Sequence, residues 1–82
     1  MENLETRLMG CFKIIFPSLD EKQIRHATSS SVPAWDSMAM VTLINVVEEE
    51  FGAQIDMHDG QQLTSFQRFL DYMRRPRDGT VQ

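Results

Sequence analysis

The sequence has little of what disulfide-bonded, metal-binding and membrane proteins need. Its 82 residues include a single cysteine, Cys11, which excludes an internal disulfide and a multi-cysteine zinc site. No apolar run approaches the length of a membrane span, and the N-terminal residues lack the basic start and apolar stretch of a signal peptide. We therefore expect one small domain in a reduced, cytoplasmic compartment, with no membrane contact.

Lysine and arginine are missing from residues 26–67. That stretch holds six acidic residues and a formal charge of −6, whereas the rest of the chain carries +2 and brings the net charge to −4. Such a stretch repels phosphate backbones, so we expect no nucleic-acid partner and favour a basic protein surface. The alternative, that the acids only keep the protein soluble, stays open. The six are Asp36, Glu48, Glu49, Glu50, Asp56 and Asp59.

Motifs of catalysis and metal binding are missing as well. The four glycines form no phosphate-binding loop, and neither His26 nor His58 has a ligand partner at metal spacing. Residues 56–59 begin like a calcium loop but lack its later ligands. A triad of Ser37, a histidine and Asp56 can be written down, but no nucleophile elbow supports it. We therefore expect neither enzyme activity nor a bound metal.

Apolar residues recur at steps of three and four along most of the chain, which is typical of helices and not of strands. The first stripe predicts a helix over residues 3–16, with Asn3 as its N-cap and Pro17 ending it. Cys11 lies on this stripe, so we expect a buried, unreactive thiol. The stripe consists of Leu4, Leu8, Cys11, Phe12 and Ile15.

Residues 17–35 form the longest connection. Ser18 and Glu21 fit a capping box, which predicts a short helical turn over residues 19–24 before an irregular stretch. Connections of this length in a small domain are usually functional or mobile. Trp35, at the end of the connection, is placed to form a hydrophobic staple with Met40 at the start of the next helix.

A second, longer helix is predicted from residue 36 or 37 to residue 51, with Gly52 as its C-terminal cap. This helix has more apolar residues than one core-facing side needs. Either the surplus packs under the preceding loop, or it forms an apolar docking face next to Ser37. The core side comprises Met40, Leu43, Ile44, Val47 and Phe51. The surplus residues are Met38, Val41 and Val46.

The last third of the chain predicts one short and one longer helix. Residues 58–63 hold an irregular turn, and Thr64 with Gln67 fits a capping box that opens a last helix, which Pro76 ends. We therefore expect an all-α domain over residues 1–75, with three principal helices, one short helix and a long first loop, and a flexible tail over residues 76–82. The last helix turns Phe66, Phe69, Leu70 and Met73 toward the core.

The two ends of the second helix carry a family resemblance. The residues at 35–38, Trp-Asp-Ser-Met, and those at 47–52, Val-Glu-Glu-Glu-Phe-Gly, with Val41 and Leu43 between them, resemble the signature of acyl carrier proteins. That signature is an Asp-Ser-Leu at a helix start, closed one helix length later by a Glu-Glu-x-Phe type of ending. Ile55 and the segment 64–73 resemble the family's last helix, so the resemblance covers residues 2–74.

The resemblance implies a four-helix bundle of the acyl carrier type, with a 4′-phosphopantetheine arm that a phosphopantetheinyl transferase moves from coenzyme A to Ser37. The arm would hold an acyl or aminoacyl group as a thioester, loaded by a ligase and passed to a downstream synthase or transferase. The protein itself would be a monomeric carrier without catalytic activity. Its partners would dock on a face formed by Asp36, Met38, Val41, Asn45, Glu48 and Glu49.

The sequence departs from the family pattern around the serine. Met38 stands in place of the usual leucine, Trp35 in place of a small residue, and Ala39 and Thr42 are neutral where fatty-acid carriers usually have acids. These departures favour a specialised carrier of secondary metabolism, serving a polyketide, a peptide or a modified sugar, over the housekeeping carrier of fatty acid biosynthesis. Two alternatives stay open: a peptidyl or aminoacyl carrier of a nonribosomal pathway, and an unmodified helical adaptor that docks to proteins.

Overall fold

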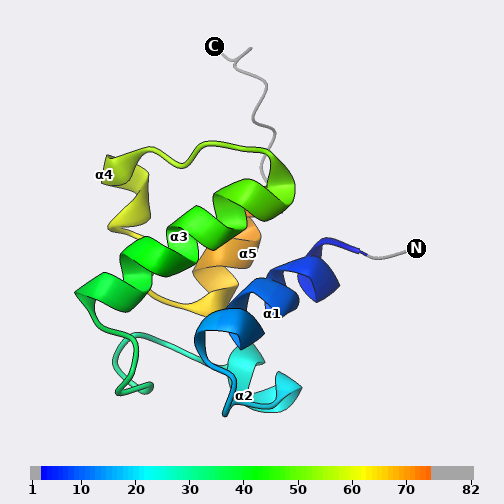
Figure 1. Ribbon diagram of the computed structural model, residues 1–82, viewed down its shortest axis with the longest axis vertical. Helices are drawn as coiled ribbons and strands as arrows, with labels where there is room; N and C mark the ends of the chain where they lie inside the picture. Colours follow the sequence, from blue (N-terminus) through cyan, green and yellow to red (C-terminus); the bar gives the residue numbers. More distant parts are fainter. Residues whose placement is uncertain (1–2, 75–82) are drawn as a thin grey trace.

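The computed structural model describes residues 3–74, which contain five helices (Figure 1). An isolated bridge between Thr28 and Ser65 is the sole extended pairing among these residues. The all-α bundle with three principal helices and a long first connection is therefore confirmed. The predicted boundary between a domain over residues 1–75 and a tail over 76–82 lies outside the described residues. The helices are α1 (Leu4–Ile15), α2 (Glu21–Arg25), α3 (Ser37–Phe51), α4 (Met57–Gly60) and α5 (Phe66–Arg74).

The two long N-terminal helices begin and end where their capping residues predict. Asn3 accepts a hydrogen bond from the Thr6 amide at 2.8 Å and opens α1. Asp36 does the same for α3, because its Oδ1 accepts from the Ala39 amide at 2.8 Å. Gly52 ends α3 in the left-handed region, at φ 63°, which a residue with a side chain rarely adopts.

The predicted capping boxes of α2 and α5 are wrong by one or two residues. Residues 16–19 form a turn that ends α1, so α2 starts later, with Asp20 and Gln23 as its capping box. For α5, the carbonyl of Thr64 accepts from the Ser29 amide in the long connection, and the hydroxyl of Ser65 caps the Arg68 amide at 3.1 Å. At α5 the Thr64 backbone is paired with the long connection, and at α2 the turn over residues 16–19 leaves Asp20 as the residue that caps the helix.

The core is built around aromatic rings contributed by α1, the long connection and α5. Phe12 is its centre, with ring centroids 5.1 Å from Phe66, 5.4 Å from Phe69 and 5.5 Å from Trp35, all in edge-on orientations. Close packing joins α1 to α2, α3 and α5, and α2 to α5, whereas α4 lies outside this set. The first helix is thus the element against which α2, α3 and α5 assemble. The residues with fully buried side chains are Leu8, Phe12, Ile24, Leu43, Val47, Phe66 and Phe69.

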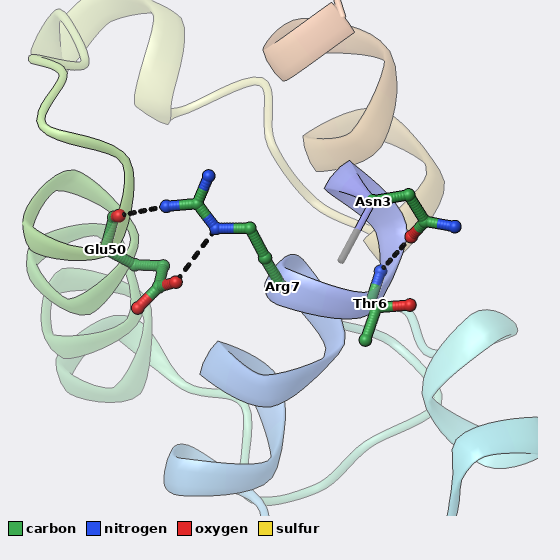
Figure 2. Close-up of polar contacts among 4 residues, drawn as sticks. All are labelled: Asn3, Thr6, Arg7 and Glu50. Atoms are coloured by element: carbon green, nitrogen blue, oxygen red, sulfur yellow. Dashed lines mark hydrogen bonds and ion pairs between the residues drawn. The ribbon is translucent and has the colours of Figure 1, made fainter. Parts of the chain in front are cut away.

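Phe51 packs against the core, as its place on the stripe predicts, but it is half-buried at the edge and not fully enclosed. The guanidinium of Arg7, from α1, lies 4.6 Å from the centre of the Phe51 ring. Arg7 also donates to the Glu50 carbonyl at 2.6 Å and to its carboxylate at 3.0 Å, as Figure 2 shows. The Arg7 side chain, at the surface, therefore holds the end of α3 against α1.

Met9 of α1 is buried, although the predicted apolar stripe did not include it.

Candidate functional site

Ser37 is the first residue of α3 and is exposed. Its neighbour Asp36 caps the helix, so the Ser37 hydroxyl is spared that task and has no hydrogen-bond partner among residues 3–74. The serines at two comparable turns differ. The Ser31 hydroxyl bonds to Thr28, and the Ser65 hydroxyl accepts from Arg68. Ser37 thus presents an exposed hydroxyl, unpaired within the described residues, at the start of a 15-residue helix.

The outer side of α3 carries exposed apolar side chains. Met38 is 79% exposed and Val41 is 59% exposed, so neither packs under the preceding loop. That loop instead contributes Val32 and Trp35 to the core. Asn45 and Glu49 are exposed on the same helix, and Asp36 is exposed at its start. The structure therefore leaves an apolar surface beside Ser37, with an acidic residue toward the far end.

The three consecutive acids of α3 have different environments. Glu48 is half-buried, and its Oε2 accepts the Ile55 amide at 2.8 Å, in the loop that follows the helix. Glu50 pairs with Arg7. Glu49 is exposed and has no ion-pair or hydrogen-bond partner for its side chain within the described part of the chain. Of the three, Glu49 is the one whose carboxylate is free to meet a partner.

A groove of about 790 Å³ opens beside Ser37, between α3 and the segment that follows it. In Figure 1 that segment turns back along α3, so that α4 lies next to the half of the helix that begins at Ser37. One wall of the groove is α3, and the other comprises Ile55, Met57, Gly60 and Gln61. The groove is therefore an open, largely apolar surface that runs along α3 from Ser37, on which an apolar group can lie.

Sequence reasoning placed several groove residues in the core. Met40 and Ile44 do pack against the core, but they are half-buried because they also line the groove. Met57, which is 82% exposed and lines the groove as well, was not predicted. Gly60 is the point of closest approach: a Cβ there would lie 2.9 Å from the Ile44 Cδ1. A glycine inside a predicted helical turn was the available signal, because it marks a place where a side chain does not fit.

The remaining polar candidates hold the fold together. Asp56 caps α4 by accepting from the His58 amide at 2.8 Å, so the calcium-like stretch is a helix start. The Tyr72 hydroxyl donates a hydrogen bond to Asp59 at 3.0 Å and so connects α5 to α4.

His26 and His58 are exposed, and residues 3–74 contain no group of three side chains that could hold a metal ion. Over the same residues, every helix is too short or too polar to cross a membrane.

Cys11 lies in the core, 3% exposed, as its place on the stripe predicts. Burial raises the pKa of its thiol from 9.0 to about 11, and the nearby Glu50 carboxylate adds to that effect. A thiol with so high a pKa is a poor nucleophile at neutral pH. Cys11 is thus a packing residue.

Comparison with known proteins finds relatives along nearly the whole chain. The acyl carrier protein of Buchnera aphidicola subsp. Schizaphis graminum (strain Sg) is 30% identical over 73 residues, which cover 89% of this chain and 92% of that protein. The acyl carrier protein of Buchnera aphidicola subsp. Acyrthosiphon pisum (strain APS) is 32% identical over 78 residues, covering 92% and 94%. No protein-family model matches the chain, and no solved structure matches it at a significant level.

Proposed function

The chain belongs to the acyl carrier protein family, and from this premise we propose that it carries an acyl or aminoacyl intermediate on a 4′-phosphopantetheine arm attached to Ser37. Members of this family are carriers without catalytic activity and generally hold such an arm. When attached, the arm would supply the thiol that binds the intermediate as a thioester. We place this function in the cytoplasm, consistent with the single, buried cysteine.

The observation that carries the proposal is the free hydroxyl of Ser37 at the N-terminus of α3. The first turn of a helix has unpaired amides and a partial positive charge, both of which tolerate a phosphate. Asp36 keeps the helix start ordered through its bond to Ala39 and leaves Ser37 available. The groove along α3 offers an apolar intermediate an open, largely apolar surface beside the same residue.

We assign partner docking to the exposed side of α3. A basic partner surface would meet Asp36 and Glu49, and a dimple in that surface would receive Met38 or Val41. Asn45 and Glu48, on the same helix, line the groove, as do Asp36 and Val41. The partners are a phosphopantetheinyl transferase, a loading ligase and a downstream synthase or transferase, each binding the monomeric carrier in turn.

We further infer a specialised pathway. Ala39 and Thr42 leave the first turns of α3 without the acids typical of fatty-acid carriers, and the Thr42 hydroxyl donates back to the Met38 carbonyl at 3.0 Å. Asp36 is therefore the one acidic residue near Ser37 at the start of α3 that a basic partner surface could contact. This supports a carrier for a polyketide, a modified sugar or a peptide, with the peptidyl carrier of a nonribosomal pathway as the second candidate.

One incubation separates a carrier from an unmodified adaptor. The purified full chain is mixed with coenzyme A and, in parallel, with several phosphopantetheinyl transferases of broad specificity, and its intact mass is measured. We expect a gain of one phosphopantetheine group. The Ser37→Ala variant, which keeps the Asp36 cap, is the control and gains nothing. An unchanged mass with every transferase, for a chain that is folded, would support the adaptor instead.

A further inference from the structure

The helix α4 forms one wall of the groove but is weakly anchored. It has four residues, and it is absent from the pairs of helices that pack closely. Its position depends on specific contacts: Gly60 against Ile44, and Asp59 bonded to Tyr72 of α5. The loop before α4, which carries Ile55, must also be held near α3 if the groove is to keep its shape.

The carboxylate of Glu48 is placed to hold that loop. It lies on α3, lines the groove, and accepts the amide of Ile55, a residue of the opposite wall, at 2.8 Å. Ile55 is 8% exposed, and its Cγ2 lies 3.9 Å from the position a Gly60 Cβ would occupy. A bond at Glu48 therefore fixes Ile55, and Ile55 in turn packs at the point where Gly60 meets Ile44.

We propose that Glu48 is a positioning residue that closes the groove beside Ser37, and that it acts through its hydrogen-bond acceptor and not through its charge. A hydrogen bond to a charged group contributes more than one between neutral groups, but an amide oxygen at the same place can still accept from Ile55. The role of Glu48 thus differs from that of its exposed neighbour Glu49, whose carboxylate faces solvent. The consequence for a tethered intermediate rests on the proposed function, whereas the groove itself can be tested on the unmodified chain.

The test compares Glu48→Ala, Glu48→Gln and Glu49→Gln in the full, unmodified chain. Amide hydrogen exchange is followed by NMR at Ile55 and at Met40, whose amide bonds to the Asp36 carbonyl within α3. The same proteins are titrated with the uncharged apolar dye N-phenylnaphthylamine to measure the affinity of the groove. Glu49→Gln is the matched control, since it removes a neighbouring charge without touching Ile55.

In Glu48→Ala we expect amide exchange at Ile55 to be about 10-fold faster and the dye to bind several-fold more weakly. Amide exchange at Met40 should stay at the parental rate. In Glu48→Gln exchange at Ile55 stays within about 3-fold of the parent, because the amide oxygen replaces the acceptor. Glu49→Gln matches the parent in both measurements. If Glu48→Ala and Glu48→Gln changed Ile55 exchange and dye affinity equally, the proposal would be overturned, because the charge of Glu48 and not its hydrogen-bond acceptor would then be responsible. Equal acceleration at Met40 would also overturn it, because Glu48 would then support the whole fold.

Loading of Ser37 is measured separately on each variant. A chain that accepts no phosphopantetheine refutes the proposed function, but it leaves the exchange and dye results to decide the role of Glu48.

Discussion

Burial of the Cys11 thiol should make the protein less stable at alkaline pH. Its pKa is raised from 9.0 to about 11 in the folded chain, so folding favours the protonated form. The stability from this group is therefore complete below about pH 9 and is lost as the pH rises toward 11. Urea unfolding should show that the free energy of unfolding falls more between about pH 8 and about pH 10.5 in the parent than in Cys11→Ala. An equal fall in both proteins would mean that burial of this thiol does not cause the loss of stability at high pH.

Phe69 and Phe51 give a direct test of the core. Phe69 is fully buried, so Phe69→Ala should lower the free energy of unfolding by about 3–5 kcal/mol, most of what a domain of this size has. Phe51 is half-buried at the surface clamp with Arg7, and Phe51→Ala should cost about 1–2 kcal/mol. Circular dichroism during urea unfolding measures both, and a larger cost at Phe51 would contradict the assignment of the core.

The helix α3 depends on its N-cap. Asp36→Ala removes the acceptor for the Ala39 amide and should cost about 1 kcal/mol, while Asp36→Asn, which keeps an acceptor, should cost less. Thermal and urea unfolding of the two variants provide the measurement. If they are equally destabilised, the charge at residue 36 matters more than the hydrogen bond.

The helices differ in how far the sequence specifies them. For α1 and α3, an N-cap, a clear apolar stripe and a stop at Pro17 or Gly52 agree, and both were predicted to within a residue. The starts of α2 and α5 lie one or two residues beyond the predicted capping boxes: a local turn over residues 16–19 precedes α2, and the Thr64 backbone pairs with Ser29 before α5, which a local pattern cannot report.

Part of the candidate site could be predicted from the sequence. Ser37 came from the family resemblance, and the periodicity of α3 marked Met38 and Val41 as apolar residues beyond its core side, which the structure shows to be exposed. The groove could not be predicted, because it arises where Gly60 approaches Ile44 from another element, and periodicity cannot report such a contact.

Across the whole molecule, negative charge is concentrated in residues 26–67, and Glu49 is an exposed part of it. Glu49→Lys should slow loading of Ser37 several-fold at low salt and have less effect near 0.5 M salt, at which screening acts over roughly 4 Å. Glu21→Lys, the same charge change on α2, is the control and should load at the parental rate. Glu49→Lys loading as fast as the parent at low salt would remove this acid from the docking face.

The apolar part of the docking face should respond differently. Met38→Ala removes an exposed side chain that a partner would bury, so loading should be slower at both low and high salt. Initial rates of mass gain at the two salt concentrations measure this. A Met38→Ala effect that disappears at high salt would contradict an apolar contact.

The central claim is that Ser37, and no other serine, accepts the phosphopantetheine arm. Fragmentation of the loaded chain in a mass spectrometer locates the added group directly. We predict that it lies on Ser37, that Ser37→Ala stays unloaded while remaining folded, and that Ser31→Ala and Ser65→Ala, whose hydroxyls are engaged in hydrogen bonds, still load. A group found on Ser31 or Ser65, or a mass gain by the Ser37→Ala variant, would contradict the account.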